Sequence, residues 1–83
     1  MNIPVDVIAV FDPVGKITPA YVRLEDERHS LVTYKIEDIS LSNEERYAGL
    51  YHLVFVCHIQ NGDLKQQLKL SFSVQNHRWL LLS

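Results

Sequence analysis

The chain has 83 residues, a net charge of −2 and a hydrophobic share of 47%. Its length excludes two independent domains, its hydrophobic share excludes intrinsic disorder, and its weak charge argues against nonspecific nucleic-acid binding as a main activity. The lone cysteine, Cys57, has no partner for an internal disulfide, and no apolar run approaches the roughly 18 residues of a membrane span. We therefore expect residues 1–83 to form one domain. The absence of a signal-peptide pattern after Met1 favours a cytoplasmic protein.

The N-terminal half begins with a predicted hairpin. Asp12-Pro13-Val14-Gly15 has the residue order of a type I turn, and its flanks, Ile3–Phe11 and Lys16–Glu25, are rich in valine and isoleucine. With Asp12 facing Gly15, the predicted pairs are Val7–Ala20, Val5–Val22 and Ile3–Leu24. Pro19 cannot donate a ladder hydrogen bond, so we expect an edge stretch or a β-bulge at that position.

The middle of the chain predicts a strand followed by a short helical segment. A polar loop at Asp26–His29 leads to a third predicted strand near Leu31–Ile39. Ser42 and Glu45 have the spacing of a capping box, and Gly49 can end a helix in the left-handed region. We therefore expect one or two helical turns within residues 42–49.

The C-terminal half carries the clearest hairpin signal. Apolar residues alternate on both sides of Asn61-Gly62, a dipeptide that favours a type I′ turn because both central residues need positive φ. With Asn61-Gly62 as the loop, the predicted pairs on the core face are Ile59–Leu64, Cys57–Gln66, Phe55–Leu68, Leu53–Leu70 and Tyr51–Phe72. A tight turn at Asn76-His77 then leads to the last predicted strand, Arg78–Leu82, whose Trp79 and Leu81 continue this face.

These elements predict an all-β fold. We expect about six antiparallel strands in a small, partly open barrel or roll, with one short helical turn between strands three and four. Such curling hides the edges of a sheet.

Metal binding and catalysis are not expected. His52 and His58 are six residues apart on one strand, about 20 Å, which is too far to share an ion, and Cys57 points away from His58. Ser71 is predicted opposite His52 as the nearest pairing of a nucleophile with a base, but on a flat outer face without an oxyanion hole. We predict a non-enzyme with no metal and no cofactor.

A candidate polar surface comprises His52, His58, Lys65 and Lys69 on the outer face of the predicted hairpin. With Arg46 or Arg78 it could contact nucleic acid, which also needs aromatic side chains for base stacking. Because the aromatic residues of this region fall on the core face, a small-barrel nucleic-acid-binding protein is the alternative rather than the leading hypothesis.

A candidate partner surface comprises four aliphatic residues on the same outer face: Val54, Val56, Leu80 and Leu82. An antiparallel sheet with one solvated face should be polar there. The chain's own helical turn and loops could cover these residues, a second copy or another protein could pack on them, or β-branched residues could simply favour strands.

Four short stretches carry a family resemblance: Ile3–Val7, Phe11–Pro19, Tyr34–Ile36 and Arg78-Trp79. They resemble a group of short uncharacterised bacterial proteins of unknown function. The resemblance implies a bacterial cytoplasmic protein and no particular site residues. The leading hypothesis is a non-catalytic binding or assembly module, a homodimer formed through a strand edge or through the candidate partner surface.

Overall fold

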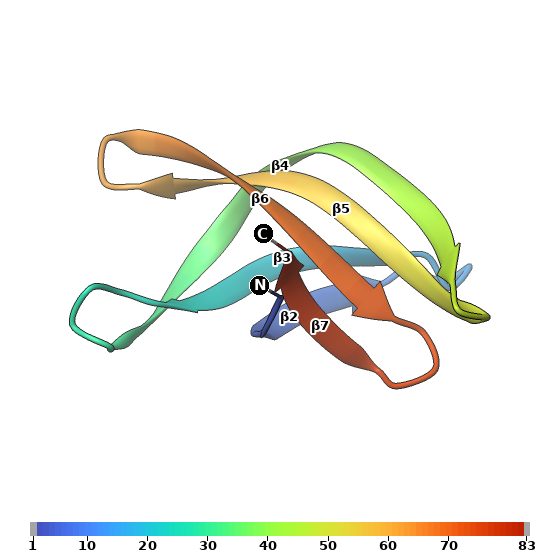
Figure 1. The fold of residues 1–83 in the computed structure, drawn as a ribbon. Coiled ribbons are helices and arrows are strands. Elements are labelled where there is room, and N and C mark those ends of the chain that lie inside the picture. Colours follow the sequence, from blue (N-terminus) through green and yellow to red (C-terminus); the bar gives the residue numbers. More distant parts are fainter. Residues whose placement is uncertain (1, 83) are drawn as a thin grey trace.

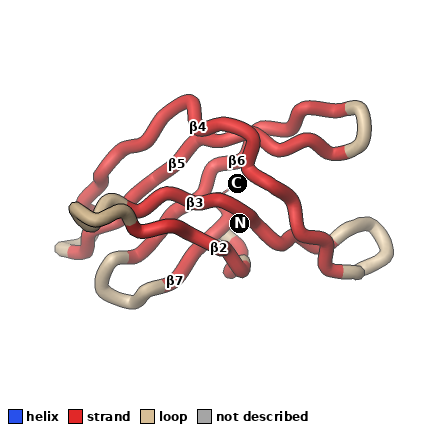
Figure 2. Tube along the Cα trace, turned by 180° about the vertical axis from the view of Figure 1, so that it is seen from behind, coloured by secondary structure: helices blue, strands red, loops and turns tan. Residues whose placement is uncertain are grey.

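The computed structural model describes residues 2–82, which form an antiparallel β fold (Figure 1). The strands are Ile3–Pro4 (β1), Asp6–Phe11 (β2), Ile17–Glu25 (β3), Leu31–Tyr47 (β4), Leu50–Asn61 (β5), Leu64–Ser73 (β6) and Arg78–Leu82 (β7). Figure 2 shows strands and loops but no helix in this described part of the chain. The all-β prediction is confirmed, but the described residues form seven strands rather than the expected six. The helical turn predicted at 42–49 is wrong, because residues 42–47 continue β4 and residues 48–49 form a turn.

The sheet curls into a small barrel-like body. Its strand order is β1-β7-β6-β5-β4-β3-β2, and only Val5 separates β1 from β2 in sequence. One N-terminal segment therefore occupies both ends of the sheet, pairing through β1 with β7 and through β2 with β3. The opposite wall is the long, bent β4, which pairs first with β3 and then with β5 (Figure 1).

Bulges account for two bends in the sheet. Ala20 is left without a partner in the β2–β3 ladder, next to Pro19, which confirms the predicted irregularity there. In β4 the register shifts at Glu37 and at Ser40, where the strand leaves β3 and joins β5. The bend keeps Ile36 and Ile39 against one core.

The turns at the two ends of β3 have the same design. The N–H of Asp12 donates to Lys16 O at 2.9 Å, and the N–H of Gly15, which has a φ of 88°, donates back to Asp12 O. Asp26 repeats this pattern, with His29 at a φ of 62° in the place of Gly15. The type I turn predicted at 12–15 is present, but the strands pair one residue further along β3 than predicted. The bulge at Ala20 adds a second residue to this shift, so Val7 faces Val22 rather than Ala20.

The two following hairpins differ from the predicted ones. Ala48 and Gly49 have φ values of 51° and 79°, and they join β4 to β5 with the positive φ at both central positions that a type I′ turn requires. Between β5 and β6 the loop is Gly62-Asp63, since Asn61 pairs with Leu64. Only Gly62 has a positive φ there, which is the type II′ pattern.

The register predicted for the β5–β6 hairpin is therefore wrong by two residues. Phe55 faces Leu70 rather than Leu68, and Ile59 faces Gln66. A shift of two residues preserves the face to which every side chain points, so the predicted core face is retained.

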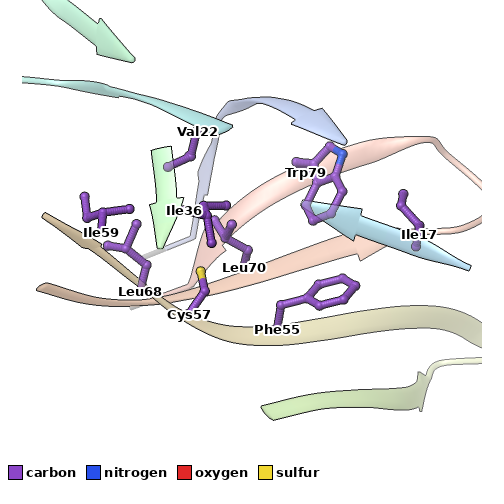
Figure 3. Close-up of a cluster of buried hydrophobic side chains, with 9 residues drawn as sticks. All are labelled: Ile17, Val22, Ile36, Phe55, Cys57, Ile59, Leu68, Leu70 and Trp79. Atoms are coloured by element: carbon purple, nitrogen blue, oxygen red, sulfur yellow. The ribbon is translucent and has the colours of Figure 1, made fainter. Parts of the chain in front are cut away.

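The core fills the inside of the curl (Figure 3). Its buried members are Ile17, Val22, Ile36, Phe55, Cys57, Ile59, Leu68, Leu70 and Trp79. The Trp79 ring lies 5.0 Å from that of Phe72 and 5.7 Å from that of Phe55, measured between centroids. Leu64 and Val74 share the core parity but are exposed, because they lie at the two ends of β6.

Candidate functional site

The candidate partner surface lies on the outer face of β5 and β7, but its centre is covered. Val54 is only 4% exposed, although it stands outside the core cluster. Its neighbours across the strands are Asn43 and Ser71, and Ser71 is buried as well. Val56, Leu80 and Leu82 are half-buried. This surface therefore offers a partner much less apolar area than its sequence suggests.

The candidate polar surface divides into two parts. His58 and Lys65 converge on Asp38, with His58 Nδ1 2.7 Å from Asp38 Oδ1 and Lys65 Nζ 3.1 Å from Asp38 Oδ2. His52 and Lys69 take no part in this cluster. The hydrogen bond from His58, followed by that from Lys65, lowers the pKa of the Asp38 carboxyl. Because Lys65 is neutralised in this way, the surface has less positive charge for phosphates than its sequence suggests.

The structure does not place Ser71 opposite His52. His52 faces Ser73 across the β5–β6 ladder, and Ser71 faces Val54, so the predicted pairing of Ser71 with His52 is wrong. Cys57 is fully buried, and burial raises the pKa of its thiol to about 11, with a smaller contribution from the charge of Asp38. In the described part of the chain, no three His, Cys, Asp or Glu side chains are grouped as metal ligands.

A further exposed apolar surface, for which the sequence predicted no site, lies on β2. Ile8, Val10 and Phe11 are 61%, 56% and 64% exposed, and Tyr21, across from Ile8 on β3, is exposed too. Val7 and Ala9 alternate with Ile8 and Val10 and pack against the core, whereas Phe11 shares their parity but is exposed at the end of the strand. The available sequence signal was a short strand that is apolar on both faces, which is unusual for an antiparallel sheet with a solvated side.

The backbone of β2 is open on one side. Val5 donates its N–H to Trp79 O of β7 at 3.2 Å, whereas Asp12 donates to Lys16 O on the β3 side. Peptide groups alternate in direction along a strand, so those of Val7 and Ala9 point away from β3. Beyond Val5, no strand among residues 2–82 pairs with this side. We call it the β2 edge, meaning the open side of Asp6–Phe11.

A second opening lies on the other side of the same N-terminal segment, beside β1. It holds a cleft of about 560 Å³ between β1 and the hairpin that joins β3 to β4. We call it the acidic cleft; its apolar residues include Ile3, Leu24, Leu31, Leu68 and Leu81, and its acidic residues are Asp6, Glu25, Asp26 and Glu27. This cleft could not be predicted from the sequence, because its walls come from segments distant in the chain.

Fold and openings together define a small, antiparallel barrel-like domain with two open sides. Comparisons of the chain with protein-family models, with curated proteins and with solved structures find no match. Within residues 2–82 there is no helix with the length and apolar character needed to cross a membrane.

Proposed function

We propose that this chain is a non-catalytic assembly module that self-associates by antiparallel pairing of its β2 edge with that of a second copy. The observation that carries the proposal is an edge strand that pairs only with β3. Its outward side chains Ile8 and Val10, and Phe11 at its end, are all more than half exposed. Natural sheets protect free edges with lysine, proline or covering loops, and Asp6–Phe11 contains neither lysine nor proline.

Charge selects one register for this pairing. Two copies related by a twofold axis can pair with Ile8 opposite Ile8 of the partner copy, or with Ala9 opposite Ala9. The Ala9-centred register would place Asp6 opposite Asp12 of the other copy, and like charges directly opposite are destabilising. The Ile8-centred register instead places Asp6 opposite Val10. It also lets the open peptide groups of Val7 and Ala9 bond across the interface.

Light scattering over a wide range of protein concentration tests the proposal. We expect a dimer at high concentration, and we expect Val10→Lys to weaken dimerisation by about tenfold or more, because a charged residue on the edge opposes pairing. Leu64→Lys is the matched control, since Leu64 is also more than half exposed to solvent but lies in the β5–β6 hairpin. A wild-type chain that stays monomeric at millimolar concentration, or a Val10→Lys dimer as tight as wild type, contradicts the proposal.

We further propose that the protein works in the cytoplasm. A single, buried and unpaired thiol suits a reducing compartment, where small domains fold without disulfides. Nucleic-acid binding stays a prediction from the sequence. The buried Phe55 and Trp79 rings and the Asp38–Lys65 pair do not favour it.

A further inference from the structure

We propose that the acidic cleft beside β1 is a separate binding site, for an extended peptide segment that carries lysine or arginine next to apolar side chains. This site shares no exposed apolar residue with the β2 edge, so the proposal does not depend on self-association. Its support comes from the shape, the apolar lining and the charge of the cleft.

The apolar lining is suited to side chains from a partner. Leu24, Leu68 and Leu81 belong to the core or pack against it, so they form a fixed wall. Ile3 and Leu31 are 50% and 63% exposed and come from opposite sides of the opening. A volume of about 560 Å³ lies within the range of ligand-binding clefts, which are mostly apolar with a few polar groups that fix orientation.

The charge of the cleft favours a cationic ligand. The cleft is lined by four carboxylates, those of Asp6, Glu25, Asp26 and Glu27, and by two basic side chains. Arg23 pairs with Asp6 at 3.6 Å, and His29 pairs with Glu25. Glu27 forms no ion pair with any described residue, so its charge is available to a partner. Charge complementarity of this kind selects partners and speeds their encounter.

The elongated shape of the acidic cleft favours an extended peptide as its ligand. A second depression of about 380 Å³ lies along the same β3–β4 hairpin, and the two share Leu24, Glu27 and Gln66 among their lining residues. The occupant is not expected to add a strand to β1. That strand has only two residues. The N–H of Val5 points toward β7, and because peptide groups alternate in direction, the backbone of Pro4 faces the opening. Pro4 has no N–H with which to bond an added strand.

A second copy of this chain is a poor occupant of the cleft. The chain has a net charge of −2, and its own exposed apolar strand begins with Asp6. Carboxylates would then face carboxylates across the contact. A basic partner segment avoids this repulsion.

Titration of the ¹⁵N-labelled protein with two synthetic peptides tests the proposal by NMR. The probes are acetyl-Leu-Lys-Val-Lys-Leu-amide and its counterpart with glutamate in place of both lysines. We expect the basic peptide to shift the amide signals of Leu24, Leu31 and Leu81, and to bind about tenfold more tightly than the acidic one. Added salt should weaken this binding, because the charges are exposed.

Variants of the protein locate the site. Glu27→Lys should weaken the affinity for the basic peptide by about tenfold. Glu44→Lys should leave this affinity unchanged, because Glu44 lies in the β4–β5 hairpin at the opposite end of the molecule (Figure 1). Equal binding of both peptides, no binding at millimolar concentration, or shifts confined to other strands overturns the proposal. Shifts at the cleft that grow with protein concentration alone would identify a second copy as the occupant and overturn it as well.

Discussion

β1 and β2 belong to one N-terminal segment, and each strand has one side without a partner strand. The residues along these two open sides differ. The opening beside β1 has a strand of two residues, a proline without an N–H and a row of carboxylates. The opening beside β2 has a strand of six residues whose peptide groups at Val7 and Ala9 are free to pair. The first is protected against an added strand, and the second is not.

An exposed backbone edge is therefore not an unavoidable feature of this small barrel-like fold. Within the same segment, the side of β1 that faces the cleft is protected by a proline and by carboxylates, only a few residues from the unprotected β2 edge. Similar residues could therefore have protected β2. An unprotected edge with exposed isoleucine, valine and phenylalanine is a liability for a monomer. It is an advantage for a chain whose role is to pair with a second copy.

A pair of proline variants should give the largest effects and tests the alternation directly. In Ile8→Pro the lost N–H points to β3, so we expect the free energy of unfolding to fall by about 1–3 kcal/mol. In Ala9→Pro the lost N–H points to the β2 edge, so we expect a loss below about 1 kcal/mol together with loss of the dimer. Urea unfolding and light scattering measure the two quantities.

The proline pair also separates fold from assembly. Equal loss of stability in both variants would show that the peptide groups of β2 do not alternate as described. An Ala9→Pro variant that keeps both its stability and its dimer would exclude the β2 edge as the interface.

The alkylation rate of the Cys57 thiol reports whether either opening admits solvent to the core. We expect this rate to be about a hundredfold lower in the native protein than in the unfolded chain. With its pKa raised from 9.0 to about 11, the thiol holds about a hundredfold less thiolate at pH 8 than an ordinary cysteine. Alkylation by iodoacetamide should therefore be slower in the native protein than in urea by at least this factor. The alkylation rate of the native protein should rise with pH up to the raised pKa of about 11. Native and unfolded rates that agree would show that the openings expose the core.

Much of the fold could be predicted from the sequence because alternation fixes faces. Phe55, Cys57 and Leu70 lie in the core as the residue parity predicted, even though the predicted register was wrong by two. The Asn61-Gly62 dipeptide located a hairpin correctly. It could not decide whether Asn61 or Asp63 joins Gly62 in the loop, because both choices suit a favoured two-residue turn.

The β4–β5 hairpin could not be predicted for a physical reason. Residues 42–46 are exposed throughout, so they lack the alternation that marks a half-buried strand, and Ser42 with Glu45 imitates a helix start. Ala48 takes a positive φ that usually requires asparagine or glycine. The β2 edge was missed because the sequence does not show that this strand lies at the end of the sheet, where one side of its backbone has no partner strand.

Substitutions in the two similar turns at the ends of β3 should change the free energy of unfolding by a smaller amount, about 0.5–1 kcal/mol. His29 borders the acidic cleft and Gly15 ends the hairpin that carries the β2 edge, and both have positive φ. Glycine adopts this conformation without the steric cost of a side chain, so His29→Gly should raise the free energy of unfolding by about 0.5–1 kcal/mol. Gly15→His should lower it by a similar amount. Urea unfolding of both variants is the measurement, and a loss of stability in His29→Gly would contradict it.

The smallest effect is expected at Asp38, where β4 leaves β3 and bends away from the β2 edge. Because the pKa of Asp38 is lowered in the folded protein, its carboxylate stabilises the fold above the pKa of the unfolded chain. That contribution is lost as the pH falls through the folded pKa, below the ordinary value of 3.8. Asp38→Asn should therefore lower the melting temperature slightly at pH 7 and leave it equal to wild type near pH 2, with dimerisation unchanged. A difference in melting temperature that persists at low pH would mean that Asp38 acts through packing rather than through its bonds to His58 and Lys65.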